Sequence, residues 1–425
     1  MRRSRVLRVP VFASLLVVGA ALLYTVLFGL PNTEPAPGMG MGVVSAMGSP
    51  QTSSRLLDRG TLPQEQANKC GTLTVIEILT TWQTLTPAER TLLEWVFFRP
   101  TDDEGGRDGK QHLLPSLYQT THFVLHYTTG TDDGQPADAP DLTDANTNGV
   151  PDYIESYASY FETSYNKEVT ERGFNPPPND AGQPPNDENN RNPNGKYDVF
   201  VYNVGNVYGH TVPEDWPNTP SRSFIGVHKD YNWAPPNDDP EGDAKGAMKV
   251  TAAHEFHHAS QFTYHVQEEG WWMETTSTYM EDEVYPAVND NYNYLADWFD
   301  LSDQYGLTTA NGWHEYGNFI WAKRLSEDFS DAIIREIWIE DQTSNGLAAI
   351  DNVLKTHGSN LVGEFNRFTK SNFFLEQLYP DGAGYRTAVA APKTAFSGVW
   401  LEFQYDFGTD GLPFTIDASN VNWDT

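Results

Sequence analysis

Hydrophobic and polar positions follow two different patterns along this chain. Residues 122–130 (HFVLHYTTG), 196–204 (KYDVFVYNV) and 223–229 (SFIGVHK) have the pattern of strands. After Pro286, the segments 316–329, 330–341 and 346–374 repeat their apolar residues at helical spacing. Because the strands and helices are segregated along the chain, the pattern predicts an α+β fold.

A helix is also predicted between the first two strands. In residues 152–169 the apolar residues form one helical stripe, which we expect to pack in the core: Ile154, Tyr157, Tyr160, Phe161 and Tyr165. Two short helices are predicted in residues 63–113, where Thr86 before Pro87 is a helix-start signal and Pro100 a stop. This N-terminal extension would either cover a site as a propeptide does or extend the packing, and we favour packing.

The N-terminus has the pattern of a membrane segment. Four arginines at positions 2, 3, 5 and 8 precede an apolar run over residues 11–30, which is long enough to span a bilayer as a helix. The positive flank predicts that the chain after residue 31 lies outside the cytoplasm. The alternative is a cleaved signal peptide, so we expect an extracytoplasmic protein that is either anchored or secreted. Residues 31–62 have the composition of a flexible linker.

Charge and cysteine content narrow the function. The 425 residues carry a formal net charge of -31, which argues against nucleic acid as a partner. Cys70 is the only cysteine, so an intramolecular disulfide and a Cys-rich zinc site are both excluded. Cys70 would either occlude a metal in an inactive precursor or be a buried thiol, and we expect the buried thiol.

A histidine pattern predicts a metal site. Residues 254–258 read HEFHH, an HExxH arrangement in which His254 and His258 share one face of a helix over residues 249–265. Both imidazoles can then reach one ion, while Glu255 lies beside it. Because a catalytic zinc uses three protein ligands and keeps an open position, a third ligand is needed.

Several residues compete for the third position. His257 lies off the shared face, and His265 is one residue beyond the place that the HExxHxxGxxH pattern requires. The remaining candidates are Glu274 and Glu281, on one face of a second helix that begins near Gly270. They lie about 10 Å apart along the helix axis, so one ion cannot bind both. Glu274 is favoured because it is nearer to the chain reversal at Gly270, and Glu281 would then support the site or lie at the surface.

These segments resemble known metallopeptidases. Residues 270–284 (GWWMETTSTYMEDEV) are similar to the WLNEGFAxYxE stretch of aminopeptidase-type gluzincins, with Glu274, Tyr279 and Glu281 on the matching positions. The resemblance implies that Glu274 is the third zinc ligand. Residues 114–286 are similar to a family of secreted bacterial zinc metalloproteases, through HFVLHYTTG, NTNGVPDYIE, KVTAAHEFHHASQF and related stretches. The exopeptidase substrate motif of the aminopeptidases is not evident, which favours an endopeptidase.

A second pattern predicts a calcium site. Residues 144–155 (DANTNGVPDYIE) place oxygen-bearing residues in the order of an EF-hand loop, with Gly149 at the sixth position. The predicted ligands are Asp144, Asn146, Asn148, Val150 through its carbonyl, Asp152 and Glu155. The preceding residues cannot form a helix, so a single bracing loop is expected. An Asn/Gly turn capped by Asp152 is the alternative.

Together these patterns predict a zinc metalloendopeptidase with structural calcium, acting on a protein or peptide substrate. Residues 114–394 would form a zincin-like domain, a mixed sheet with the active-site helix followed by a mainly helical part, and 395–425 a short β segment. Glu255 would be the general base, and Tyr316 or His314 would donate to the oxyanion. The alternative is a calcium-braced adhesion module with a vestigial zinc site. Membrane contact is expected only through residues 1–30, and oligomeric state is left open.

Overall fold

The computed structural model describes residues 6–10, 68–102, 111–130, 136–179, 195–302, 304–389, 400–404 and 421–423. The chain divides into two compact units. The smaller unit comprises Met1–Val44, Phe299–Gly306 and Ala390–Thr425, and the larger one Ser45–Trp298 and Leu307–Val389. All of the predicted site residues belong to the larger unit.

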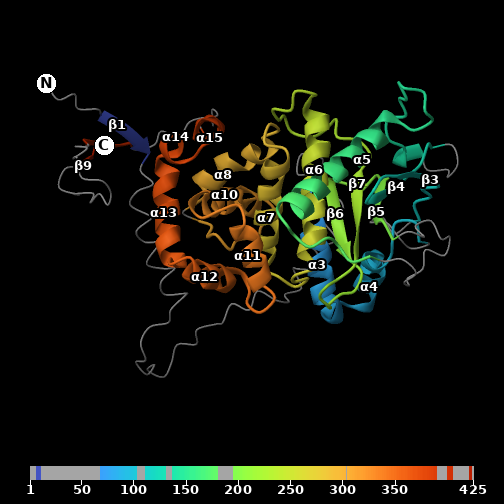
Figure 1. Cartoon of the computed structure of the whole chain (residues 1–425), viewed down its shortest axis with the longest axis horizontal. Coiled ribbons are helices and arrows are strands. Elements are labelled where there is room, and N and C mark those ends of the chain that lie inside the picture. The colour runs from blue at the N-terminus through green and yellow to red at the C-terminus, as the bar shows by residue number, and fades with distance from the viewer. Residues whose placement is uncertain are drawn as a thin grey trace. The chain divides into compact units, whose positions relative to one another are not determined.

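A mixed six-stranded sheet forms one half of the larger unit (Figure 1). Its strand order is β2-β6-β7-β5-β4-β3. The bounds are β2 Asn68–Cys70, β3 Ser116–Gln119, β4 Phe123–Tyr127, β5 Tyr197–Tyr202, β6 Val207–Pro213 and β7 Ser223–His228. Strands β4, β5 and β7 are parallel, β2 is parallel to β6, and the β3–β4 and β6–β7 pairs are antiparallel. The three strands predicted from the sequence are present as β4, β5 and β7.

Helices cover both faces of this sheet. Helices α5 (Asp152–Tyr165) and α6 (Asp243–Gln261) pack on one face, where Val199 and Val201 of β5 point. Helix α3 (Thr72–Thr81) and the short helix η3 (Glu94–Phe97) pack on the other, against Phe200 and Tyr202. Successive strand residues point to opposite faces, so a strand covered on both sides is a continuous apolar run.

Residues 68–102 therefore contribute to the core of the larger unit. They provide the edge strand β2, the covering helix α3 and helix α4 (Pro87–Leu93). The predicted helix start is present, because the Thr86 side chain accepts a hydrogen bond from the Glu89 amide and Glu89 reciprocates.

The other half of the larger unit is helical (Figure 1). Helix α7 (Gly270–Val284) lies against α6, and α9 (His314–Gly317) and α10 (Phe319–Asp328) pack against α7. The remaining helices are η6 Asp290–Tyr294, α8 Leu295–Asp300, α11 Ile333–Glu340, α12 Gly346–Thr356, α13 Leu361–Phe373, α14 Leu375–Leu378 and α15 Gly382–Val389. The mainly helical C-terminal part and the α+β class are thus confirmed.

The smaller unit contains a three-stranded antiparallel sheet in the order β1-β8-β9. The strands are β1 Val6–Pro10, β8 Trp400–Gln404 and β9 Val421–Trp423. The apolar run 11–30 and the linker 31–62 lie outside the described residues. Within the part of the chain that the structure describes, no helix has the length and apolar character needed to cross a membrane.

Candidate metal centre

Helix α6 carries the HExxH residues through the middle of the larger unit. Every residue of α6 from Val250 to Gln261 is buried, because the helix lies between the sheet and α7. Gly209 of β6 permits this close approach, since a Cβ there would lie 2.9 Å from Cγ of Glu255 and 3.0 Å from Cγ2 of Thr251. The strand thereby holds Glu255 next to the sheet edge.

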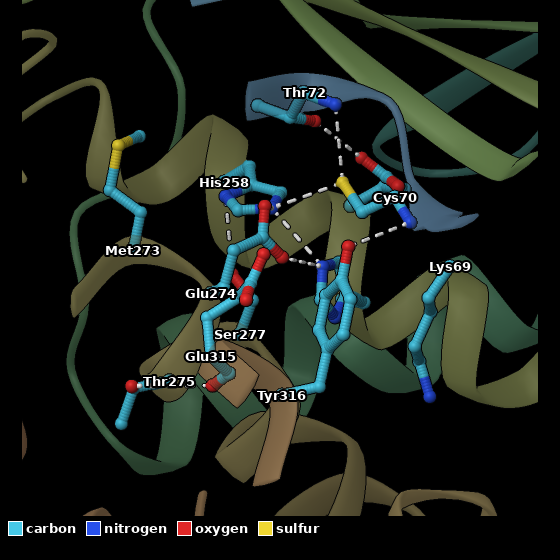
Figure 2. A network of polar contacts seen from close by, with 12 residues as sticks. Lys69, Cys70, Thr72, His258, Met273, Glu274, Thr275, Ser277, Glu315 and Tyr316 are labelled. Carbon is cyan, nitrogen blue, oxygen red and sulfur yellow. Dashed lines mark hydrogen bonds and ion pairs between the residues drawn. The ribbon is translucent and has the colours of Figure 1, made fainter. Parts of the chain in front are cut away.

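Four side chains from three elements converge at this point (Figure 2). Donor atoms of Cys70, His254, His258 and Glu274 all lie within 4.8 Å of one another. Nε2 of His254 lies 3.1 Å from Nε2 of His258 and 3.0 Å from Oε2 of Glu274. Sγ of Cys70 lies 3.4 Å from Nε2 of His258. The structure thus brings together the three predicted ligands and adds the thiol.

The cluster fits a zinc ion in donor type and spacing. Zinc binds sulfur, nitrogen and carboxylate oxygen, and tetrahedral bonds of about 2.0–2.3 Å separate neighbouring donors by about 3.3–3.6 Å. The distances above are close to that range. Oε1 of Glu274, which is fully buried, lies 3.5 Å from Nε2 of His258 and has no hydrogen-bond partner among the residues that the structure describes. A buried carboxylate oxygen in this state is a free donor for a cation.

The charge state of the cluster leads to the same conclusion. Burial lowers the pKa of His254, but hydrogen bonds to Glu274 and Glu281 raise it overall to about 10. Burial raises the pKa of Glu274, but the charges of His258 and His254 and their hydrogen bonds lower it overall to about 2. In the metal-free chain a protonated His254 therefore balances the ionised Glu274, and a bound cation would take the place of that proton.

Hydrogen bonds on the far side of each ring fix its orientation. Nδ1 of His254 lies 2.7 Å from Oε1 of Glu281, whose other oxygen accepts from Nζ of Lys69 at 2.6 Å. Lys69 also pairs with Asp290. Glu281 is buried behind His254, so it does not lie at the surface, and its supporting role stays a prediction. Such partners orient a metal-binding imidazole and raise its basicity.

Gln261 performs the same task for His258. Its Nε2 donates to the Met273 carbonyl at 2.8 Å and to hydroxyls of α7, which leaves Oε1 as an acceptor. Oε1 lies 2.8 Å from Nδ1 of His258, so that nitrogen carries the proton. The lone pair of Nε2 then faces the cluster, as metal binding requires.

Glu255 lies beside the cluster and is held by two hydroxyls. Its Oε2 accepts from Oγ1 of Thr72 at 3.1 Å and from Oγ1 of Thr211 at 2.8 Å. Thr211 belongs to β6 and Thr72 begins α3, so the sheet edge positions this carboxylate. The sequence-based expectation that Glu255 is separate from the ligands agrees with this arrangement.

Tyr316 reaches the site and His314 does not. The Tyr316 hydroxyl accepts a hydrogen bond from the Cys70 amide at 3.2 Å, and its ring centre lies 6.2 Å from that of His254. Burial, with the charges of Glu274 and Cys70, raises the pKa of Tyr316 well above its usual value, so the hydroxyl stays protonated. His314 stacks on Trp298 at 5.7 Å.

Two other histidines that competed for the metal are directed elsewhere. Nδ1 of His257 lies 2.8 Å from Oε2 of Glu168, and Nδ1 of His265 lies 3.1 Å from Oε2 of Glu268. Neither belongs to the metal cluster found among the described residues.

The predicted calcium loop is a tight exposed turn before α5. Asp144 accepts from the Gly149 amide at 2.8 Å and from the Asn148 amide at 3.2 Å. Glu155 accepts from the side-chain amides of Asn146 and Asn148. Gly149 has a φ of 89°, which suits the sharp bend at the sixth loop position. The oxygen-bearing side chains thus surround one small region, and calcium there stays a prediction.

The sequence did not place a second set of residues around the centre: Lys69, Thr72, Thr211, Gln261, Ser277 and Asp290. For Cys70 it offered contact with a metal only as the less favoured alternative. Cys70 is buried as expected, but it lies within the cluster instead of apart from it. Its strand has only three residues, and β6 was not predicted. Among these residues, only Gln261 stood out in the sequence, because it occupies the position of the glycine in the HExxHxxGxxH pattern.

Comparison with known proteins places part of the chain in a family model. Residues 243–372 match a family of unknown function (DUF6055). This stretch begins with α6 and includes α7 and α9, so it contains His254, Glu255, His258, Glu274 and Tyr316 but not Cys70. No curated protein and no solved structure matches the chain. The match thus covers the helices of the candidate site, and because the function of the family is unknown it assigns no activity to this chain.

Proposed function

We propose that this protein is a zinc-dependent metallopeptidase that cleaves internal peptide bonds outside the cytoplasm. Its metal ligands would be His254, His258 and Glu274. The observation that carries this proposal is the convergence of both Nε2 atoms of the HExxH helix with a carboxylate from α7, while Glu255 lies beside them without joining the cluster. The location outside the cytoplasm rests on the apolar run of residues 11–30.

The chemistry divides between the metal and the chain. Zinc bound at this site would polarise a peptide carbonyl and make water acidic enough to lose a proton near neutral pH. Glu255 would accept that proton and pass it to the leaving amine, because it is an unligated carboxylate next to the ligands. Tyr316, kept protonated by its surroundings, would donate a hydrogen bond to the oxygen that gains negative charge.

The binding module with a vestigial site is the second candidate, and one observation favours it. Four protein donors surround the centre and all four residues are buried. Structural zinc sites are closed in this way, whereas catalytic sites keep a position for water. The two candidates differ in whether Glu255 has a function, since a structural metal does not need a base.

Glu255→Gln distinguishes the two functions. Zinc content and cleavage of a mixed peptide library are measured for the natural chain, for Glu255→Gln, and for both in a Cys70→Ala background, because the thiol touches His258. We expect Glu255→Gln to keep one zinc per chain and to lose most of the cleavage.

Glu168→Gln is the matched control. Glu168 is buried and contacts His257, which lies on α6 as Glu255 does. Burial raises the pKa of Glu168 well above its usual value, so glutamine resembles the neutral form of this side chain. Cleavage by Glu255→Gln at the normal rate would refute the mechanism. Absence of cleavage in both backgrounds, with zinc bound, would favour the closed structural site.

A further inference from the structure

One short segment, residues 69–72, contacts several functional groups of the centre, and Figure 2 shows Cys70 beside His258 and Tyr316. Sγ of Cys70 lies 3.4 Å from Nε2 of His258, and the Cys70 amide donates to the Tyr316 hydroxyl at 3.2 Å. Oγ1 of Thr72 donates to Glu255 at 3.1 Å, and Lys69 donates to Glu281 at 2.6 Å. Three residues of this segment therefore contact one proposed ligand, the proposed base, the proposed oxyanion donor and the carboxylate behind His254.

The same segment occupies the edge of the sheet beside the site. Strand β2 pairs in parallel with β6, with Asn68 opposite Val207 and Cys70 opposite Gly209. The Gly71 amide donates to the Gly209 carbonyl at 2.9 Å. Without β2, the exposed edge would be β6, which holds Glu255 through Thr211. Because extended peptides bind by adding a strand to a free edge, β2 lies where a substrate strand would pair.

A second observation, independent of this segment, points to a metal at the centre. The unpartnered Oε1 of Glu274 is a donor independent of Cys70, and it is fully buried in the cluster. With His254 and His258 it provides three ligands, so the Cys70 sulfur completes a four-coordinate set. A set of four protein donors leaves no position for water, and catalysis at zinc requires one.

We propose that Cys70 is the fourth metal ligand and that residues 69–72 are a built-in inhibitor, so that the chain folds as a latent form of the metallopeptidase. This inference rests on the proposed function. Helix α3 follows at once and is anchored in the core through Val75, Ile78 and Leu79. Opening the site therefore requires the Cys70 sulfur to leave the centre while the core residues of α3 stay in place.

Ligation by the thiol is tested by spectroscopy, which does not depend on activity. The protein is loaded with Co²⁺ in place of zinc, and the near-ultraviolet sulfur-to-cobalt band is recorded for the natural chain and for Cys70→Ser. Cys70 is the only cysteine, so any such band must come from it. We expect the band in the natural chain and its loss in the variant. A natural chain that binds Co²⁺ without the band overturns the proposal.

Inhibition is tested with zinc-loaded proteins on the peptide library. Cys70→Ala and Cys70→Ser should each keep one zinc per chain and cleave at least tenfold faster than the natural chain. Thr72→Val serves as a second variant, which should keep the cobalt band while removing the hydroxyl that engages Glu255. Thermal melting of each variant confirms that it folds.

The possible outcomes distinguish failure of this inference from failure of the proposed metallopeptidase function. A folded Cys70→Ala chain that no longer holds zinc overturns latency, because the sulfur would then be needed to hold the metal. A natural chain that cleaves as fast as Cys70→Ala overturns it as well, while the metallopeptidase stands. The cobalt band without cleavage by any variant would support ligation and refute inhibition together with the proposed function.

Discussion

Replacing Glu281 with glutamine tests how the groups behind the ligands act on metal binding. Its carboxylate bridges Nδ1 of His254 at 2.7 Å and Nζ of Lys69 at 2.6 Å, and all three residues are buried. Hydrogen bonds to charged groups contribute about 1.5–3 kcal/mol. Glutamine keeps one acceptor oxygen but loses the negative charge, so the imidazole becomes less basic and less firmly oriented.

The expected effect is a 10–100-fold weaker zinc affinity, which corresponds to about 1.4–2.7 kcal/mol. Glu274→Gln should have a larger effect, because it replaces an anionic proposed ligand, whose oxygen lies 3.0 Å from Nε2 of His254, with a neutral amide. It should abolish stoichiometric zinc binding, and Glu281→Gln should retain it at saturating zinc.

Competition with a chromophoric zinc chelator measures both affinities. Glu283→Gln is the matched control, since Glu283 lies on the same helix and pairs with Arg172 away from the cluster. It should bind zinc as the natural chain does. If Glu281→Gln loses the zinc while Glu274→Gln retains it, the ligand assignment is wrong even for a protein that remains a metallopeptidase.

Three further predictions concern stability. Burial lowers the pKa of His254, but hydrogen bonds to Glu274 and Glu281 raise it overall from 6.5 to about 10. The metal-free chain should therefore lose stability as the pH rises from 6.5 to about 10, because the folded state holds this proton more tightly than the unfolded state does. Saturating zinc should remove this dependence, and a melting temperature that is constant across the window without metal would contradict it. Removing calcium with zinc held saturating should lower the melting temperature and increase proteolysis at residues 144–155, and an unchanged melting temperature would count against the calcium loop. Gly209→Ala should lower the free energy of unfolding by about 1–3 kcal/mol in urea titrations, because the new Cβ would lie 2.9 Å from Cγ of Glu255. An unchanged free energy of unfolding would show that α6 can move away from the strand.

The parts of this site that local geometry determines were predictable from the sequence. His254 and His258 are one turn apart, so a helix alone brings their rings together. The placement of Glu274 needed one more element, a second helix starting at Gly270, and the structure begins α7 at that residue. Strands β4, β5 and β7 were likewise visible in their patterns.

Contacts between distant segments were not predictable in this way. Cys70 and His258 are 188 residues apart, and no spacing rule links them. The strand that carries Cys70 has three residues and is held by its neighbour β6, so it has no periodicity of its own. Strand β6 contains Gly209 and ends at Pro213, two residue types that weaken a strand signal. The arrangement of residues 69–72 beside the candidate site is therefore visible only in the structure.

Gln261 shows how a departure from a known motif carries information. In the HExxHxxGxxH pattern the residue three after the second histidine is glycine, and glutamine there argued only against that pattern. In the structure its amide hydrogens are used by α7, so its oxygen must accept from Nδ1 of His258. The same side chain therefore joins α6 to α7 and fixes which nitrogen of His258 faces the cluster. A glycine at this position would have no side chain to make this link, so Gln261 suits a site in which the proposed third ligand comes from α7.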